Sequence, residues 1–221
     1  MLVARSTRTA LCILAIVLLA ACATAPPQPA EDDGLVPVPT AMLDELFVDP
    51  TVPLSNYKRV MIDPIEISFR DGWRQQHPDL SDHDFEVLTR QLTTMLHDTL
   101  VKEFARGGYT LVESPDHDVL RVHASIVGAE FAGPEVGVDK STRTYNLGGM
   151  TLQVQGFDGP SGALVARARD VDGDQETRIF KLADRTSTLV LAQQVFDRWA
   201  EKLRSAMDVA KVHAGARTPQ Q

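Results

Sequence analysis

The acidic run from Asp170 to Glu176 resembles the start of a calcium-binding loop. Its carboxylates recur with the spacing that calcium loops use to place oxygen ligands. An EF-hand loop also needs glycine at its sixth position and glutamate at its twelfth, where this chain has Gln175 and Lys181. A strand, not a helix, is expected before the run. The sequence therefore predicts a solvated loop here and no calcium site.

A second polar group matches no known catalytic or metal-binding spacing. It comprises His77, Asp79, Asp82, His83 and Asp84. The last two aspartates suit the start of a helix, where the dipole favours negative charge. His117 and His123 stand apart from this group, and the chain contains no HExxH pair, GxSxG elbow, P-loop or dinucleotide-binding glycine pattern. We therefore predict no catalytic residue, no metal site and no cofactor.

The two cysteines, Cys12 and Cys22, both lie near the start of the chain. Arg5 and Arg8 precede an apolar run, 11–21, that ends in small residues directly before Cys22, which is the layout of a secretory signal. A helix needs about 20 apolar residues to span a bilayer, so this run is too short. The motif LAAC, 19–22, resembles the lipobox of bacterial lipoproteins. That resemblance implies that Cys22 is the lipid attachment site and the first residue of the mature chain.

The same resemblance implies a location. Several acyl chains on Cys22, palmitate among them, would anchor the protein stably, because a single chain gives only marginal membrane binding. The residue after Cys22 is Ala23 and not aspartate, which would change the membrane to which such a lipoprotein is sorted. In a Gram-negative host this implies the periplasmic face of the outer membrane. An uncleaved anchor and a plain secretory cut after Ala21 are the alternatives.

Charge and cysteine content narrow the classes of partner. The signal carries two of the 22 basic residues and none of the 30 acidic ones, which leaves 20 against 30 and a formal charge near −10. Nucleic-acid binding needs clustered basic residues, so no nucleic-acid partner is expected. The lipid on Cys22, and not charge, must then hold the protein on a membrane. No disulfide can form, so stability must come from an apolar core.

Composition divides the chain into four parts. Residues 1–21 are the predicted signal peptide, and 22–52 form the acylated cysteine with a flexible, proline-rich tether that includes the acidic triplet 31–33. Residues 53–214 are predicted to form one folded domain. Residues 215–221 are expected to be a disordered tail. The most apolar part of the tether, 42–47, is the part that could already contact the domain.

Two helices and several strands are predicted within the domain. Ser81 with Asp84 resembles a capping box, and apolar residues then recur at helical spacing as far as Gly107-Gly108, which predicts a helix over 82–106. A similar stripe predicts a final helix over 187–213. Alternating apolar and polar residues predict strands over 59–69, with a break at Asp63-Pro64, over 109–112 and 119–131, and in a hairpin over 152–169. A polar loop is predicted at 73–79. The predicted fold is α+β, in the order strand-helix-strands-helix, with an antiparallel sheet and two long helices packed on one face.

Several segments together resemble a family of bacterial lipoproteins known as domain of unknown function 3313. They are 54–67 with Phe69 and Trp73, 108–122, 149–152, 158–162, 166–170 and 196–200. The turn 158–162 departs from the family pattern, which has serine and threonine beside the glycine. The resemblance implies an envelope lipoprotein, and it implies no reaction and no catalytic residue.

Two functional hypotheses follow from the sequence. The first is a membrane-anchored, non-catalytic binding or structural module with an envelope protein as its partner. The second is a hydrolase or metal-dependent enzyme whose site is dispersed along the chain. A deep pocket with converging histidines and aspartates would favour the enzyme, and a shallow apolar surface beside the sheet would favour binding.

Overall fold

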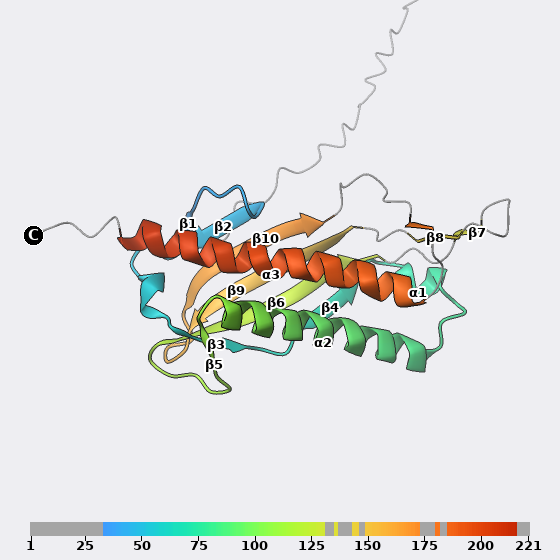
Figure 1. Cartoon of the computed structure of the whole chain (residues 1–221), viewed down its shortest axis with the longest axis horizontal. Helices are drawn as coiled ribbons and strands as arrows, with labels where there is room; N and C mark the ends of the chain where they lie inside the picture. The colour runs from blue at the N-terminus through green and yellow to red at the C-terminus, as the bar shows by residue number, and fades with distance from the viewer. Residues whose placement is uncertain are drawn as a thin grey trace, which may run out of the picture. The chain divides into compact units, whose positions relative to one another are not determined.

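A mixed β-sheet covered by two long helices forms the folded part of the chain (Figure 1). The computed structural model describes residues 33–130, 135–136, 143–145, 149–172, 180–181 and 185–215. Its elements are, in chain order, β1 (Val36–Pro37), β2 (Glu45–Val48), the 3₁₀ helix η1 (Leu54–Asn56), β3 (Arg59–Ile62), β4 (Glu66–Phe69), α1 (Trp73–Gln76), α2 (Asp82–Arg106), β5 (Thr110–Leu111), β6 (Val119–Ala129), β7 (Glu135–Val136), β8 (Arg143–Tyr145), β9 (Met150–Asp158), β10 (Leu164–Asp172), β11 (Phe180–Lys181) and α3 (Arg185–Gly215). The α+β class is confirmed.

The main sheet is mixed, so the predicted antiparallel sheet is wrong in part. Its strands lie in the order β1-β2-β10-β9-β6-β3-β5, and β4 also pairs with β6. The pairs β1–β2, β2–β10, β10–β9 and β9–β6 are antiparallel. By contrast, β3 and β4 run parallel to β6, and β5 runs parallel to β3. The reason is α2, which carries the chain back along the sheet so that the strands after it run in the same direction as those before it. A separate sheet contains β11, β8 and β7.

The two long helices pack side by side on one face of the main sheet (Figure 1). The predicted bounds of α2 are confirmed: Ser81 Oγ accepts a hydrogen bond from the backbone N–H of Asp84 at 3.1 Å, and the helix ends at Arg106 before two glycines. Side chains from both helices and the sheet share the core. Those with no exposed surface include Val60, Leu92, Leu96, Leu100, Ala124, Ile126, Ala192 and Phe196. None of the helices in the described ranges is both long and apolar enough to cross a membrane.

The segment before residue 53 is not a tether along its whole length. β2 pairs with β10 over Glu45–Val48 and Ala166–Arg169, and β1 pairs with β2. Leu43, Leu46 and Val48 are buried in the core. The proline-rich composition of 22–52 hides a short strand whose alternating residues point into the core, which is why the sequence placed the domain start too late.

The polar loop predicted at 73–79 contains a short helix, α1. Gly72 has a φ of +77°, and α1 follows it directly. Trp73 is buried, with its ring 4.8 Å from that of Phe69 and 4.2 Å from that of His77. This aromatic stack holds α1 against the core. The polar residues around Trp73 concealed it in the sequence.

Candidate functional site

The predicted lipid attachment site, Cys22, lies outside the described residues, which begin at Asp33. The predicted metal-binding candidates are dispersed. His77 is held by α1, with Nδ1 2.8 Å from the carbonyl oxygen of Trp73, and Asp82 pairs with Arg74 at 2.9 Å. His117 contacts Asp116 in a turn. Over the described ranges, no three histidine, cysteine, aspartate or glutamate residues come together as a metal site.

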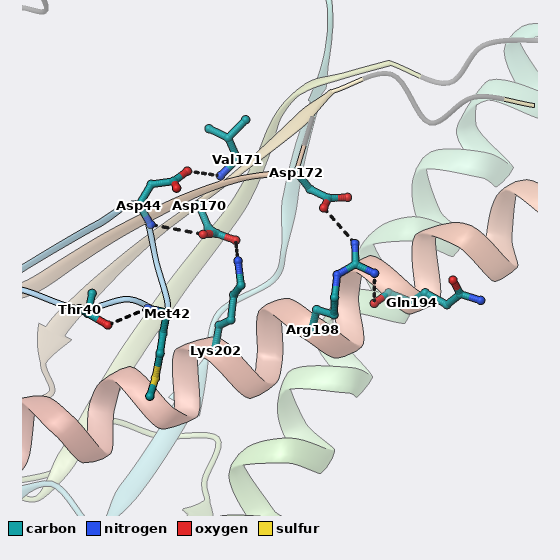
Figure 2. Close-up of polar contacts among 9 residues, drawn as sticks. All are labelled: Thr40, Met42, Asp44, Asp170, Val171, Asp172, Gln194, Arg198 and Lys202. Carbon is teal, nitrogen blue, oxygen red and sulfur yellow. Dashed lines mark hydrogen bonds and ion pairs between the residues drawn. The ribbon is translucent and has the colours of Figure 1, made fainter. Parts of the chain in front are cut away.

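The acidic run begins inside β10, and its first two aspartates are bound by α3 (Figure 2). The Lys202 ammonium donates a hydrogen bond to Asp170 Oδ2 at 2.6 Å, and Arg198 donates one to Asp172 at 2.9 Å. Asp170 is 2 % exposed. The remaining acidic residues of the run, Asp174 and Glu176, lie outside the described residues. Asp170 therefore has a structural role as the buried partner of a lysine.

The same carboxylate fastens the N-terminal segment to the sheet (Figure 2). The backbone N–H of Asp44 donates to Asp170 Oδ1 at 3.3 Å, and the backbone N–H of Val171 donates to Asp44 Oδ2 at 2.8 Å. Asp44 directly precedes β2. The contacts of Asp44, Asp170 and Lys202, which we call the junction, thus connect the residue directly before β2 with β10 and α3.

One histidine has an acidic neighbour in the fold. His123 Nδ1, on β6, is 3.5 Å from Asp63 Oδ2, and Asp63 is 4 % exposed. The Asp63 carboxylate is bound mainly by Arg121, whose Nε donates to both of its oxygens at 2.8 and 2.9 Å. This contact raises the pKa of the Arg121 guanidinium. Among the described residues no hydroxyl is hydrogen-bonded to His123.

The face of the sheet turned away from the helices is polar. On β6, β9, β10 and β2 the residues that alternate with the core residues point to this side. Strand register aligns His123, Gln155, Arg167 and Phe47 in one row, and Ser125, Gln153, Arg169 and Glu45 in the next. We call these eight residues the open face. They line a hollow of about 220 Å³.

Two arginines dominate the electrostatics of the open face. Arg167 lies over the ring of Phe47, with its guanidinium carbon 4.8 Å from the centroid, and Nη1 is 2.8 Å from Asp33 Oδ2. Arg169 is 3.5 Å from Glu45. Both are ion pairs, and within the described part of the chain neither guanidinium donates a hydrogen bond. The open face therefore presents two guanidinium groups whose charges are paired but which donate no hydrogen bond to the described residues.

A second cavity, between the sheet and α3, is apolar and small. Its volume is about 50 Å³, and Leu120, Gly156, Ala166, Leu203 and Met207 are among the residues that line it. Ligand pockets are usually about 300–1,000 Å³. We therefore regard this cavity as a gap in core packing left by Gly156 and Ala166, not as a ligand site.

Comparison with known proteins assigns the family. A family model described as "Protein of unknown function (DUF3313)" matches residues 28–203. The chain belongs to the DUF3313 family. This confirms the resemblance seen in the sequence, and the matched range begins before β1, as the structure also requires. No functionally curated protein shows significant sequence similarity to this DUF3313 chain.

Solved structures resemble this DUF3313 chain only distantly. A minor lipoprotein from Acinetobacter baumannii is 13 % identical, with a TM-score of 0.37 over 75 % of this chain and 98 % of that one. A PelC dodecamer from Paraburkholderia phytofirmans is 12 % identical, with a TM-score of 0.37 over 67 % and 89 %. The protein XCC0632 from Xanthomonas campestris is 10 % identical, with a TM-score of 0.40 over 72 % and 89 %.

Sequence reasoning missed both the junction and the open face of this DUF3313 protein. The solvated loop predicted from Asp170 onwards is wrong for Asp170, which lies in β10, is buried, and alternates in phase with Ala166 and Ala168, which face the helices. That phase was the available signal. The alternation also predicts that Arg167 and Arg169 lie on the side of the hairpin opposite Ala166 and Ala168, and this is confirmed. Nothing local indicated that Phe47, or Asp33 far upstream, would lie beside Arg167.

Proposed function

We propose that this chain is an envelope lipoprotein, acylated at Cys22 and held at the periplasmic face of the outer membrane. Its folded domain acts as a non-catalytic module that binds a protein partner through the open face. Membership of DUF3313 and the lipoprotein-like signal before Cys22 support the first statement.

The observation that carries the binding role is the open face itself. Ser125, Gln153 and Gln155 make no side-chain hydrogen bond within the residues that the structure describes, and no described helix covers them. Arg167 and Phe47 add the residue types that are enriched at protein interfaces. The open face is polar and not the apolar surface expected of a binding module, but an arginine beside an aromatic ring suits a protein partner better than it suits a small substrate.

The anchoring statement is tested on Cys22. Mass spectrometry of the mature protein should find acyl groups on Cys22 and no residue upstream of it. Replacing Cys22 with serine should abolish acylation and release the protein from outer-membrane fractions. A serine variant that is processed and membrane-bound like the wild type would contradict the anchoring proposal.

The binding role is tested by photo-crosslinking in intact cells. A photoreactive amino acid at Gln155, on the open face, should give discrete crosslinked products whose mass spectra identify one partner. The matched control is the same amino acid at Arg90, which is exposed on α2. Products of equal number and intensity from both positions, or none from Gln155, would contradict the role of the open face.

A further inference from the structure

The arginines of the open face differ from Arg121 and Arg204 in how they contact acidic side chains. Arg121 donates two hydrogen bonds to Asp63, and Arg204 binds Glu103 at 2.7 Å. Arg167 and Arg169 make ion pairs without hydrogen bonds inside the described ranges, although their side chains are only 29 % and 41 % exposed. A guanidinium has five N–H donors, and it binds carboxylates most strongly when two of them align. Ion pairs hold the two guanidinium groups in place, but their N–H groups donate no hydrogen bond to the described residues.

Asp33 shows how a carboxylate sits on this surface. Its Oδ2 is buried and lies 2.8 Å from Arg167 Nη1, without the alignment of a hydrogen bond. The φ of +76° at Gly34 turns the chain beside Asp33, and the backbone N–H of Leu35 donates to Asp33 Oδ1 at 3.1 Å. A loop of this protein thus places one carboxylate at the edge of the hollow and leaves most donors of Arg167 available.

We propose that the open face binds an extended acidic segment of the partner protein, whose carboxylates pair with Arg167 and Arg169. This rests on the proposed function, and it names the chemistry of the partner. Residues two apart on a strand are about 6.6 Å apart and point the same way. An extended peptide with acidic residues at alternate positions has the same spacing. Gln153 and Gln155 stand beside the two arginines in the register and can bind the backbone of that peptide.

The charges around the arginines favour a short peptide over a large polyanion. Asp33 and Glu45 flank the pair, and the mature chain carries a formal charge near −10. A membrane surface or a nucleic acid would meet that repulsion over its whole area. A short acidic segment meets only the two local carboxylates, because salt screens more distant charges beyond about 8 Å. Asp33 is therefore a competitor of the partner at Arg167.

The test measures binding of the labelled peptide Asp-Thr-Asp-Thr-Asp to the purified mature protein in neutral detergent. The peptide Asn-Thr-Asn-Thr-Asn is the uncharged control. Arg167→Gln and Arg169→Gln should each weaken binding about tenfold, as expected for loss of a charge-assisted contact. Arg90→Gln, which removes the same charge from α2, should change it less than twofold. Asp33→Asn should tighten binding severalfold, because it removes the competitor.

Three results would overturn the proposal. They are equal binding of the two peptides, equal effects of the open-face and Arg90 variants, and unchanged or weaker binding by an Asp33→Asn variant that melts like the wild type. Arginine-dependent binding to vesicles of equal parts phosphatidylcholine and phosphatidylglycerol, in place of the peptide, would assign the surface to lipid. If Gln155 still gives its specific crosslinks while the acidic peptide does not bind, the open face is a binding surface but its partner is not acidic.

Discussion

The buried pair of Asp170 and Lys202 gives the sharpest test of the junction. Replacing Lys202 with methionine keeps most of the length of the unbranched side chain and removes its charge. Among the described residues, the Asp170 carboxylate, 2 % exposed, would then keep only the backbone N–H of Asp44 as a partner, at 3.3 Å. Breaking a fully buried ion pair costs about 3–5 kcal/mol. Because the Lys202 side chain is 39 % exposed, water screens part of its attraction to Asp170. We therefore expect the free energy of unfolding to fall by about 2–3 kcal/mol.

Urea unfolding of the mature protein, followed by tryptophan fluorescence, measures this loss. Trp199 is 1 % exposed and lies on α3 less than one turn from Lys202, so it reports unfolding of this region. The matched control is Arg198→Met on the same helix. Its partner Asp172 is 23 % exposed and Arg198 itself is 45 % exposed, so the control should cost less than about 1 kcal/mol.

A double-mutant cycle separates the pair from other effects of the substitution. Adding Asp170→Asn to Lys202→Met removes the uncompensated charge and should restore at least half of the lost stability. The reasoning would be refuted if Lys202→Met cost no more than Arg198→Met. It would also be refuted if the double variant were less stable than Lys202→Met alone, because the buried charge would then not be the source of the loss.

Three further predictions concern the core, a turn and pH. Leu92→Ala should destabilise the domain by about 2–5 kcal/mol in the same urea assay, since Leu92 has no exposed surface; a loss below about 1 kcal/mol would mean that this face of α2 is not packed. Gly159→Ala should cost about 1–3 kcal/mol, because its new Cβ would lie 2.6 Å from the carbonyl oxygen of Asp116, and a melting temperature equal to the wild type would disprove this contact. Hydrogen bonds from Ser161, and then Tyr57, hold the pKa of Asp158 below its ordinary value, so its contribution is present above about pH 3.9 and is lost as pH falls through the lower, folded-state pKa. The stability difference between wild type and Asp158→Asn should therefore be largest near neutral pH and shrink below about pH 4, and a difference that grows with acidity would have the wrong sign.

Elements whose signals are local were predictable from the sequence. The bounds of α2 follow from the Ser81 cap, the helical spacing of Leu92, Leu96 and Leu100, and the glycine at 107. The hairpin of β9 and β10 follows from alternation on both sides of a glycine-rich turn. In that turn the backbone N–H of Gly162 donates to the carbonyl oxygen of Asp158 at 2.8 Å. In each case the information lies within one turn of helix or one pair of adjacent strands.

Elements whose signals are distant were not predictable. Strand direction is absent from the period-two pattern, so β3 and β4 gave no sign that they would run parallel to β6. β2 pairs with a strand more than a hundred residues later, and that pairing explains why Leu46 and Val48, on one side of β2, are buried. The pairing of Asp170 with Lys202 is equally remote in sequence. A single sequence shows which faces are polar but not which polar residues meet.

The two sides of β10 have different roles because side chains alternate along a strand. Asp170 points toward the helices and binds both Asp44 and Lys202, so the N-terminal segment is fixed to the core from that side. Arg167 points the other way and meets Asp33, which lies closer to Cys22 in the chain. Both contacts therefore act on the segment that leads to the predicted anchor, one from each face of the sheet. A partner that displaces Asp33 from Arg167 would release only the outer contact, because the junction at Asp170 does not depend on it. Binding at the open face can thus change how the start of the domain is held without loosening the core.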